Sequence, residues 1–130
     1  MSTADNKALV TKFWEAFSAS KFDDALAMLS DDATWWVAGT TALSGKYTKP
    51  EFATLLGNVT GGAPQGIQVT PKQLTAEDNR VSVEAESYGE ISNGKTYRNS
   101  YHFMMECRDG RISAVREYLD TEHVTEVFGD

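Results

Sequence analysis

The chain of 130 residues lacks several features that would assign it to a defined functional class. It has a single cysteine, Cys107, so an intrachain disulfide is excluded. No apolar run approaches the roughly 20 residues that a membrane-spanning helix needs. The first residues do not form a basic region followed by an apolar stretch, and we therefore predict a cytoplasmic protein that does not enter the membrane.

Metal ligands and cofactor motifs are equally scarce. The two histidines of the chain do not make a metal site. The glycine-rich stretch of residues 61–66 lacks the spacing of a phosphate-binding loop and reads as a connection between elements. We therefore expect neither a metal nor a cofactor.

Positive charge is also in short supply, since 12 lysines and arginines stand against 19 acidic residues, a net charge of −7. A nucleic-acid-binding protein needs a basic face, and an anionic membrane surface would repel this chain, so neither partner is expected. Hydrophobic residues at 41% and aromatic residues at 11% are instead typical of a globular protein. At this length we expect one domain over residues 1–130.

Two helices are predicted at the start of the chain. Apolar residues recur at helical spacing from Leu9 to Phe17, which predicts a helix over about residues 3–18 with a broad face against a sheet. Ser20, with an acidic residue three positions later, predicts the start of a second helix. That helix is expected to end at residues 30–32.

A short strand and a third helix are predicted next. In a strand over residues 33–38, Trp35 and Trp36 must point to opposite faces, and we expect Trp35 to line the interior. Thr48 and Glu51 have the spacing of a capping box and predict where the third helix begins. Between them, Pro50 suits the first helical turn.

From Ile67 onward the hydrophobic period changes to two, which predicts antiparallel strands joined by hairpins. Pro71 predicts an edge position or a bulge in the first of these strands. Asn93-Gly94 and Asp109-Gly110 predict tight turns on either side of a long strand over residues 96–108, because glycine supplies the positive φ that such turns need. Helices followed by a hairpin-connected sheet indicate an α+β fold. A curved antiparallel or mixed sheet wrapped around the N-terminal helices would leave a concave cavity, and small ligands bind in such cavities.

Two carboxylates, Glu117 and Asp120, stand among apolar residues of the last predicted strand. A carboxyl group kept from water has a raised pKa and can act as an acid or base near neutral pH. Both are therefore candidate catalytic residues. Each also has a structural alternative: Glu117 as a carboxylate bonded to a neighbouring Tyr, Trp or Arg, and Asp120 as the cap of a final helical turn. Residues 121–128 read as either a short helix or an extended tail.

Several motifs carry a family resemblance over essentially the whole chain. They are Phe13-Trp14-Glu15-Ala16-Phe17, Leu29-Ser30-Asp31-Asp32-Ala33-Thr34-Trp35-Trp36, Asp109-Gly110-Arg111-Ile112 and Arg116-Glu117-Tyr118-Leu119-Asp120-Thr121. With them the chain resembles the ketosteroid isomerase-like, or SnoaL-like, branch of the nuclear transport factor 2-like superfamily. The resemblance implies an α+β cone with a deep apolar pocket, commonly as a homodimer packed through the outer sheet face. It does not name an activity, because this fold hosts isomerases, polyketide cyclases, epoxide hydrolases, dehydratases and non-catalytic binders.

The catalytic residues of these enzymes have few counterparts here. The proton-transferring Asp of ketosteroid isomerases corresponds to Val37, and their oxyanion-binding Tyr corresponds to Phe13, which argues against that particular chemistry. In limonene-type epoxide hydrolases the last-strand Asp corresponds to Glu117, whereas their Arg and second Asp correspond roughly to Ala85 and Ser87. Polyketide cyclases of the SnoaL type use a late-strand Asp, a role that only Glu117 or Asp120 could fill.

The resemblance also implies which residues face the pocket. Together with the alternation of the strands, it gives this predicted ligand-binding set: Phe13, Trp35, Val37, Asn99, Tyr101, Phe103 and Val115. The first functional hypothesis is a cofactor-free enzyme of the isomerase or cyclase type on a small, largely apolar molecule. In it Glu117 moves a proton while Tyr101 or Asn99 polarises a carbonyl oxygen. The alternatives are a non-catalytic domain that binds a hydrophobic ligand, and an epoxide hydrolase-like activity with an altered catalytic set.

Overall fold

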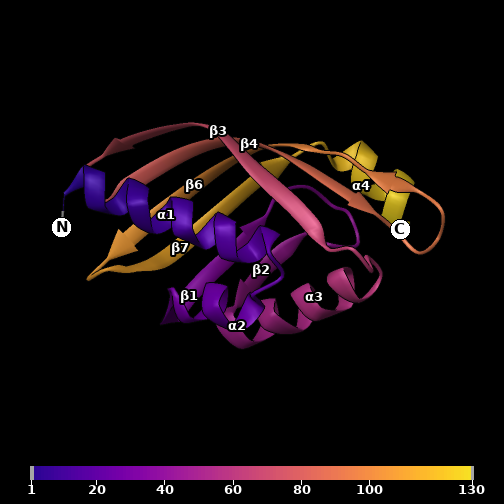
Figure 1. The fold of residues 1–130 in the computed structure, drawn as a ribbon, viewed down its shortest axis with the longest axis horizontal. Coiled ribbons are helices and arrows are strands. Elements are labelled where there is room, and N and C mark those ends of the chain that lie inside the picture. The colour runs from indigo at the N-terminus through magenta and orange to yellow at the C-terminus, as the bar shows by residue number, and fades with distance from the viewer. Residues whose placement is uncertain (1, 130) are drawn as a thin grey trace.

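A computed structural model describes residues 2–129 of the chain (Figure 1). Helices and strands follow in this order: α1 (Thr3–Ser18), α2 (Phe22–Ala27), β1 (Leu29–Val37), β2 (Gly45–Thr48), α3 (Lys49–Gly61), β3 (Ile67–Glu77), β4 (Arg80–Glu90), β5 (Thr96–Tyr97), β6 (Ser100–Arg108), β7 (Arg111–Leu119) and α4 (Thr121–Phe128).

The strands form one curved, unclosed sheet in the order β2-β1-β7-β6-β4-β3, with β5 paired to β4. Neighbouring strands are antiparallel except β1 and β7, which run parallel. Figure 1 shows the long strands arching over α1, with α2 and α3 beside β1 and β2, and with α4 at the end of the molecule away from the N-terminus. The predicted α+β class and its curved mixed sheet are confirmed.

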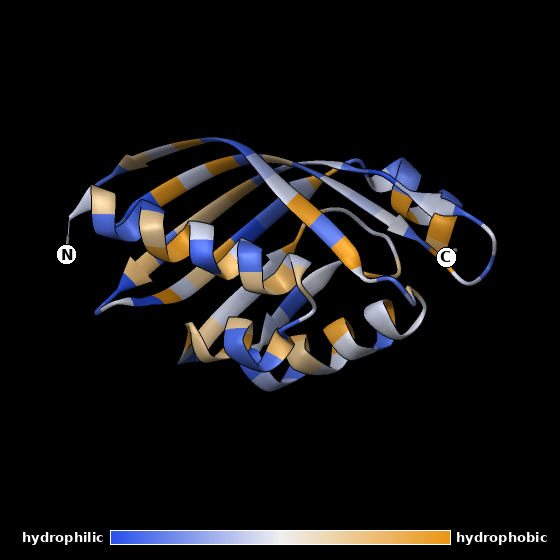
Figure 2. Cartoon of the chain, in the orientation of Figure 1, coloured by the Kyte–Doolittle hydropathy of each residue, from blue (hydrophilic) through white to orange (hydrophobic). Residues whose placement is uncertain are grey.

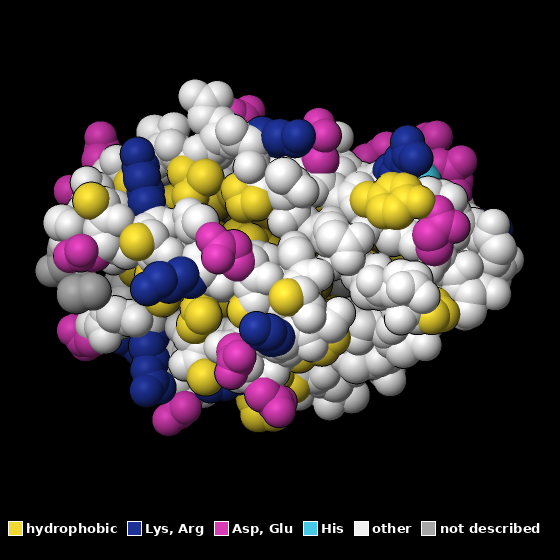
Figure 3. Space-filling model, viewed as in Figure 1, with side chains coloured by type: hydrophobic (Ala, Val, Ile, Leu, Met, Phe, Trp, Pro, Cys, Tyr) yellow, Lys and Arg dark blue, Asp and Glu magenta, His cyan; other side chains and the backbone are white. Residues whose placement is uncertain are grey.

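The core lies between the concave face of this sheet and the helices. Along β4 the side chains of Val81, Val83 and Ala85 are buried while those between them point away, as the period of two predicts. Hydrophobic and hydrophilic bands alternate along the strands in Figure 2. On the face of the molecule seen in Figure 3, acidic and basic side chains are interspersed.

The first helix begins and faces the sheet as its sequence predicts. Ser2 Oγ accepts a hydrogen bond from the Asp5 N–H at 3.0 Å, and Asp5 Oδ2 accepts one from the Ser2 N–H at 3.2 Å. This capping box satisfies two backbone donors that a helix start leaves free. The buried stripe of α1 then delivers Trp14 and Phe17 to the concave face of the sheet.

The second helix and the first strand differ from their predicted bounds. Ser20 has a left-handed φ of 61° and lies outside α2, whose N-cap is Lys21. The predicted capping role of Ser20 is therefore wrong. β1 begins at Leu29 rather than residue 33, because Leu29 pairs with Ile112 of β7 and the Ile112 N–H donates to the Met28 carbonyl at 2.8 Å. Pairing with a distant strand, which local sequence does not report, extends the strand.

The hairpins of the sheet form where the dipeptides predict them. Asp109 and Gly110 have φ values of 53° and 78° and join β6 to β7. Pro71 lies in the edge strand β3, next to a shift of register between Pro71 and Gln73. The long strand predicted over residues 96–108 is instead divided into β5 and β6, with Asn99 in the break.

The third helix carries a second capping box. Thr48 Oγ1 accepts from the Glu51 N–H at 3.3 Å, and Glu51 Oε1 accepts from the Thr48 N–H at 2.8 Å. The helix continues through Gly57 and ends at Gly61. It covers the side of the core next to Trp35, on which Phe52 stacks at 4.0 Å.

We predict that Thr48→Ala lowers the free energy of unfolding by about 1 kcal/mol, because it removes the side-chain acceptor of the helix cap. Urea denaturation measures this change. Thr54→Ala is the matched control, since Thr54 is exposed on the same helix and its hydroxyl donates to the Pro50 carbonyl. That control should stay within about 0.5 kcal/mol of the parent chain. Equal losses in the two variants would contradict the capping role.

Candidate functional site

A cavity of about 80 Å³ lies between the concave face of the sheet and α1, α3 and α4. Eight of its sixteen lining residues are aromatic, and Glu117 is the one among them with a charged side chain. The lining consists of Trp14, Phe17, Trp35, Val37, Leu43, Phe52, Leu55, Leu56, Val59, Ile67, Val69, Tyr97, Tyr101, Phe103, Glu117 and Phe128.

Glu117 reaches this cavity from the middle of β7, opposite Phe103 of β6 and beside Val37 of β1. Its Oε1 accepts a hydrogen bond from Trp35 Nε1 at 2.9 Å. Burial raises the pKa of Glu117 to about 7, while the bond from Trp35 opposes the rise by stabilising the carboxylate. Near neutral pH this group is therefore present in both protonation states, as an acid–base catalyst requires.

Two tyrosines place a pair of hydroxyl groups on the same cavity. Tyr97 and Tyr101 lie 2.8 Å apart at their hydroxyl oxygens, and the Tyr101 hydroxyl donates to Ser87 Oγ at 3.0 Å. Burial is the main cause that raises the pKa of each tyrosine above its ordinary value, and the negative charge of Glu117 adds to it. Both side chains are therefore neutral phenols that can donate or accept a hydrogen bond near pH 7.

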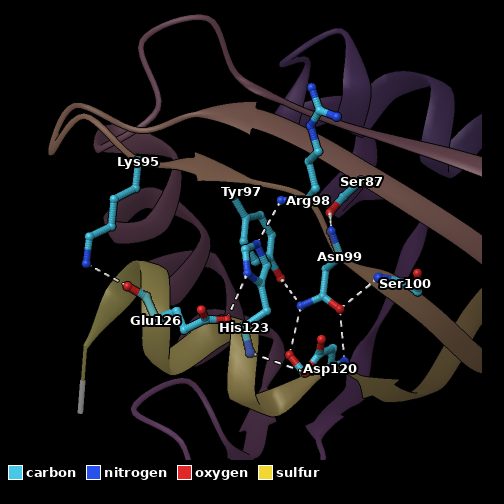
Figure 4. A network of polar contacts seen from close by, with 9 residues as sticks. All are labelled: Ser87, Lys95, Tyr97, Arg98, Asn99, Ser100, Asp120, His123 and Glu126. Carbon is cyan, nitrogen blue, oxygen red and sulfur yellow. Dashed lines mark hydrogen bonds and ion pairs between the residues drawn. The ribbon is translucent and has the colours of Figure 1, made fainter.

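The Tyr97 hydroxyl is oriented by Asn99, in the break between β5 and β6 (Figure 4). Asn99 Oδ1 accepts from the Ser100 and Asp120 N–H groups at 2.8 and 2.9 Å. The amide nitrogen must therefore be the donor to the Asp120 carbonyl at 3.0 Å and to the Tyr97 hydroxyl at 3.1 Å. Because Tyr97 accepts from Asn99, its own proton is directed to Tyr101 or into the cavity.

The last helix closes the end of the cavity with Phe128. Lys95 Nζ donates to the Glu126 carbonyl at 2.6 Å, and His123 Nε2 accepts from the Arg98 N–H at 3.0 Å (Figure 4). The His123 ring also stacks on Tyr97, with ring centres 5.5 Å apart. These contacts hold α4 against the segment that carries Tyr97.

The predicted ligand-binding residues divide into two groups. Trp35, Val37, Tyr101 and Phe103 line the cavity together with the candidate base Glu117. The other three lie away from its lining: Phe13 and Val115 are buried in the core, and Asn99 reaches the cavity only through Tyr97.

The second candidate catalytic residue, Asp120, lies at a different place in the fold. Its side chain is exposed and accepts the His123 N–H at 3.2 Å, which makes it the N-cap of α4. It does not contribute to the lining of the cavity. The helical alternative for residues 121–128 is therefore the one that the structure contains.

Sequence reasoning missed the other residues of the lining, among them Tyr97, Phe128 and the cavity-facing residues of α3. Tyr97 lies two residues before Asn99 and four before Tyr101, so in the predicted long strand all three side chains share one face. The alternation could therefore have predicted that Tyr97 faces the cavity. For α3 the apolar stripe was visible, but which part of the sheet it covers depends on tertiary packing. Within residues 2–129, no group of three His, Cys, Asp or Glu side chains is placed to hold a metal ion. In the same range, no helix has the length and apolar character needed to cross a membrane.

Comparison with known families supports the assignment of the fold. Residues 10–115 match the profile of the SnoaL-like domain. The chain belongs to the SnoaL-like family. No curated protein sequence matches this SnoaL-like chain.

Solved structures of the same fold are numerous but distant in sequence. Bal32a, from a soil-derived mobile gene cassette, superposes with a TM-score of 0.86 at 18% identity over 95% of this chain and 96% of its own. TerC, co-crystallised with polyporic acid, superposes with a TM-score of 0.83 at 18% identity, over 97% of this chain and 99% of its own. A protein of ketosteroid isomerase-like fold from Catenulispora acidiphila, in complex with trimethylamine, superposes with a TM-score of 0.74 at 15% identity. The match covers 85% of this chain and 83% of that protein. At these identities the likeness establishes the fold alone.

We predict that the raised pKa of Glu117 makes the SnoaL-like chain less stable as pH rises. The folded state holds this proton more tightly than the unfolded state, whose pKa lies near 4.5. The contribution of Glu117 to the free energy of unfolding therefore falls between about pH 4.5 and 7 and stays constant above that window. Glu117→Gln should be more stable than the parent chain by about 3 kcal/mol at pH 8 and nearly equal at pH 4. Urea denaturation at both pH values checks this, and a difference that does not change with pH would contradict it.

We predict that Trp35→Phe raises the titration midpoint of Glu117 above about 7, because the variant keeps the aromatic ring but loses the donor that stabilises the carboxylate. A carbon-13 NMR titration of the side-chain carboxyl measures the midpoint. Trp36→Phe is the control, since Trp36 lies on the opposite face of β1, against Tyr118. An unchanged midpoint in Trp35→Phe would show that the hydrogen bond does not influence the titration.

Proposed function

We propose that this SnoaL-like protein binds a small, largely apolar molecule in the cavity and that Glu117 moves a proton on it without a cofactor. The observation that carries the proposal is the single carboxyl group, with a pKa of about 7, inside an otherwise apolar and aromatic lining. Such a group has the proton affinity that general acid–base catalysis near neutral pH requires.

The arrangement suits proton abstraction next to a carbonyl group. In this reaction the Glu117 carboxylate takes a proton from the carbon beside the carbonyl, and the electron pair of that C–H bond forms an enolate. The Tyr97 hydroxyl, whose oxygen accepts from Asn99, rotates its proton away from Tyr101 and donates it in a hydrogen bond to the enolate oxygen. The protonated Glu117 then returns the proton to a conjugated carbon, which completes an isomerisation. In a cyclisation the enolate carbon would instead attack a second carbonyl carbon of the same molecule, and the alkoxide that forms would take the proton from Glu117.

A non-catalytic ligand-binding domain is the second candidate. The hydrogen bond from Trp35 gives Glu117 a structural role that needs no turnover. Polyporic acid bound to TerC and trimethylamine bound to the Catenulispora acidiphila protein support a small-molecule site in this fold, whether catalytic or not. The epoxide hydrolase alternative has less support, because Ser87, at the position of the second acid, is buried and bonded to Tyr101.

We also propose that the chain forms a homodimer through the outer sheet face, as its family resemblance implies. Trp36 and Met104 are only half buried there, and Tyr118 is 43% exposed. A second copy would cover this apolar surface.

Proton exchange tests the catalytic proposal without knowledge of the natural substrate. Small ketones, from acetone to cyclopentanone, are incubated with the protein in D2O, and NMR follows deuterium entering the carbon beside the carbonyl. We expect exchange faster than the buffer rate, and a loss of about 100-fold or more of the catalysed part in Glu117→Gln.

Glu84→Gln is the control for this experiment, because Glu84 is exposed on β4 and undergoes the same chemical change. It should leave the exchange rate as in the parent chain. Ketones that bind, as shown by chemical-shift changes of cavity residues, but exchange no faster than in buffer would favour the non-catalytic candidate.

A further inference from the structure

Three properties of the cavity together determine the charge and the size of the group that it can bind. Its walls are rich in aromatic rings, including Trp35 stacked on Phe52 and Tyr101 stacked on Phe103. Its one charged lining residue is an acid, Glu117, and no Lys or Arg belongs to the described lining. It is also small, at about 80 Å³.

We propose that the molecule bound in the cavity carries a small alkylammonium group, held by the aromatic walls and paired with the Glu117 carboxylate. The inference rests on the cavity being a ligand site, as proposed above, and does not depend on proton transfer.

Aromatic faces attract such a cation directly. The ring quadrupole presents negative charge on its face, and the attraction strengthens when water is excluded. A fully alkylated ammonium has no N–H donors to satisfy, so it can enter an apolar lining without leaving an unpaired hydrogen-bonding group behind. Its alkyl groups bury apolar surface at the same time.

The Glu117 carboxylate attracts a cation, because the lining of the cavity, within residues 2–129, contains no positively charged side chain to pair with it. The side-chain hydrogen bond to Glu117 comes from Trp35, which is a neutral donor. A buried charge without an opposite partner is costly, and a bound cation would remove that cost. An anionic ligand would meet the opposite situation, because it would place a second negative charge beside Glu117 with no cation in the lining to offset it.

The volume limits the size of the ion. An apolar cavity of roughly 150 Å³ accommodates benzene, so a cavity of about 80 Å³ suits a group of only a few non-hydrogen atoms. Tetramethylammonium is about as bulky as benzene and would fill this partly open cavity, whereas a polycyclic ligand would extend out of it.

Other titratable groups around Glu117 do not change the charge of the site near neutral pH. Tyr47 on β2, Tyr97 on β5 and Tyr101 on β6 interact with its charge, and each has a pKa raised above that of an ordinary tyrosine. They remain neutral while Glu117 titrates. The pH dependence of cation binding should therefore follow Glu117 alone.

Tetramethylammonium and tert-butanol are the matched probes, because they have nearly the same size and shape and differ in charge. Their affinities are measured by chemical-shift titration of the cavity residues between pH 5 and 8.5. We expect tetramethylammonium to bind at least about tenfold more tightly than tert-butanol at pH 8. Its affinity should fall below pH 7 as Glu117 takes up its proton, by at most about tenfold per pH unit, and level off at the affinity of Glu117→Gln. The affinity of tert-butanol should not fall in this way.

Glu117→Gln should lower the affinity for tetramethylammonium by about tenfold or more at pH 8 and remove its pH dependence. Glu84→Gln should change neither. If Glu117→Gln does not fold, the pH dependence in the parent chain still decides the question.

Equal binding of the two probes, or binding of tetramethylammonium that is independent of pH, would overturn the alkylammonium inference and leave the ligand site in place. If neither probe binds but ketones still exchange their protons, the inference fails while the proposed function stands. If neither probe binds and ketones neither bind nor exchange, both fail.

Discussion

The hydrogen bond from Trp35 Nε1 to Glu117 Oε1 is the interaction on which the site depends. It joins β1 to β7 across the parallel pair of the sheet, where Trp35 lies opposite Val115 and Val37 opposite Glu117. Side chains alternate between the two faces of a strand, so a slip of one residue would bring Trp36 and Tyr118 inward and carry Glu117 to the outer face. The register that buries the tryptophan also positions the carboxylate, and packing of Phe52 on Trp35 fixes the ring that donates the bond.

A second constraint acts at the end of the cavity formed by β5, β6 and α4. The break that divides β5 from β6 frees the side chain of Asn99 to bind both main-chain groups of Asp120, at the point where α4 begins. That contact holds the helix, and the same amide also orients the Tyr97 hydroxyl. Asn99 therefore links the shape of the cavity to its hydrogen-bonding character, although it does not touch the cavity itself.

Features set by near neighbours in the chain were predictable from the sequence, and features set by distant pairing were not. The Asp109-Gly110 turn and the Thr48 capping box depend on a few consecutive residues, and both form as predicted. The start of β1 at Leu29 depends on Ile112, more than 80 residues further along, so local signals placed it too late. The two acids show the same division. The family resemblance together with the alternation of β7 turned Glu117 inward, whereas the position of Asp120 depended on whether the following residues form a helix.

The carboxyl group of Glu117 is not explained by its hydrogen bond alone. A glutamine at this position could accept the same bond from Trp35 through its amide oxygen, and it would avoid the cost of burying a charge among aromatic rings. What Glu117 provides beyond a glutamine is a removable proton and, above pH 7, a negative charge. A bound cation or a reacting C–H bond would use those two properties, and the neutral lining provides neither. The physical difference between these two side chains therefore supports the roles in binding and reaction proposed above.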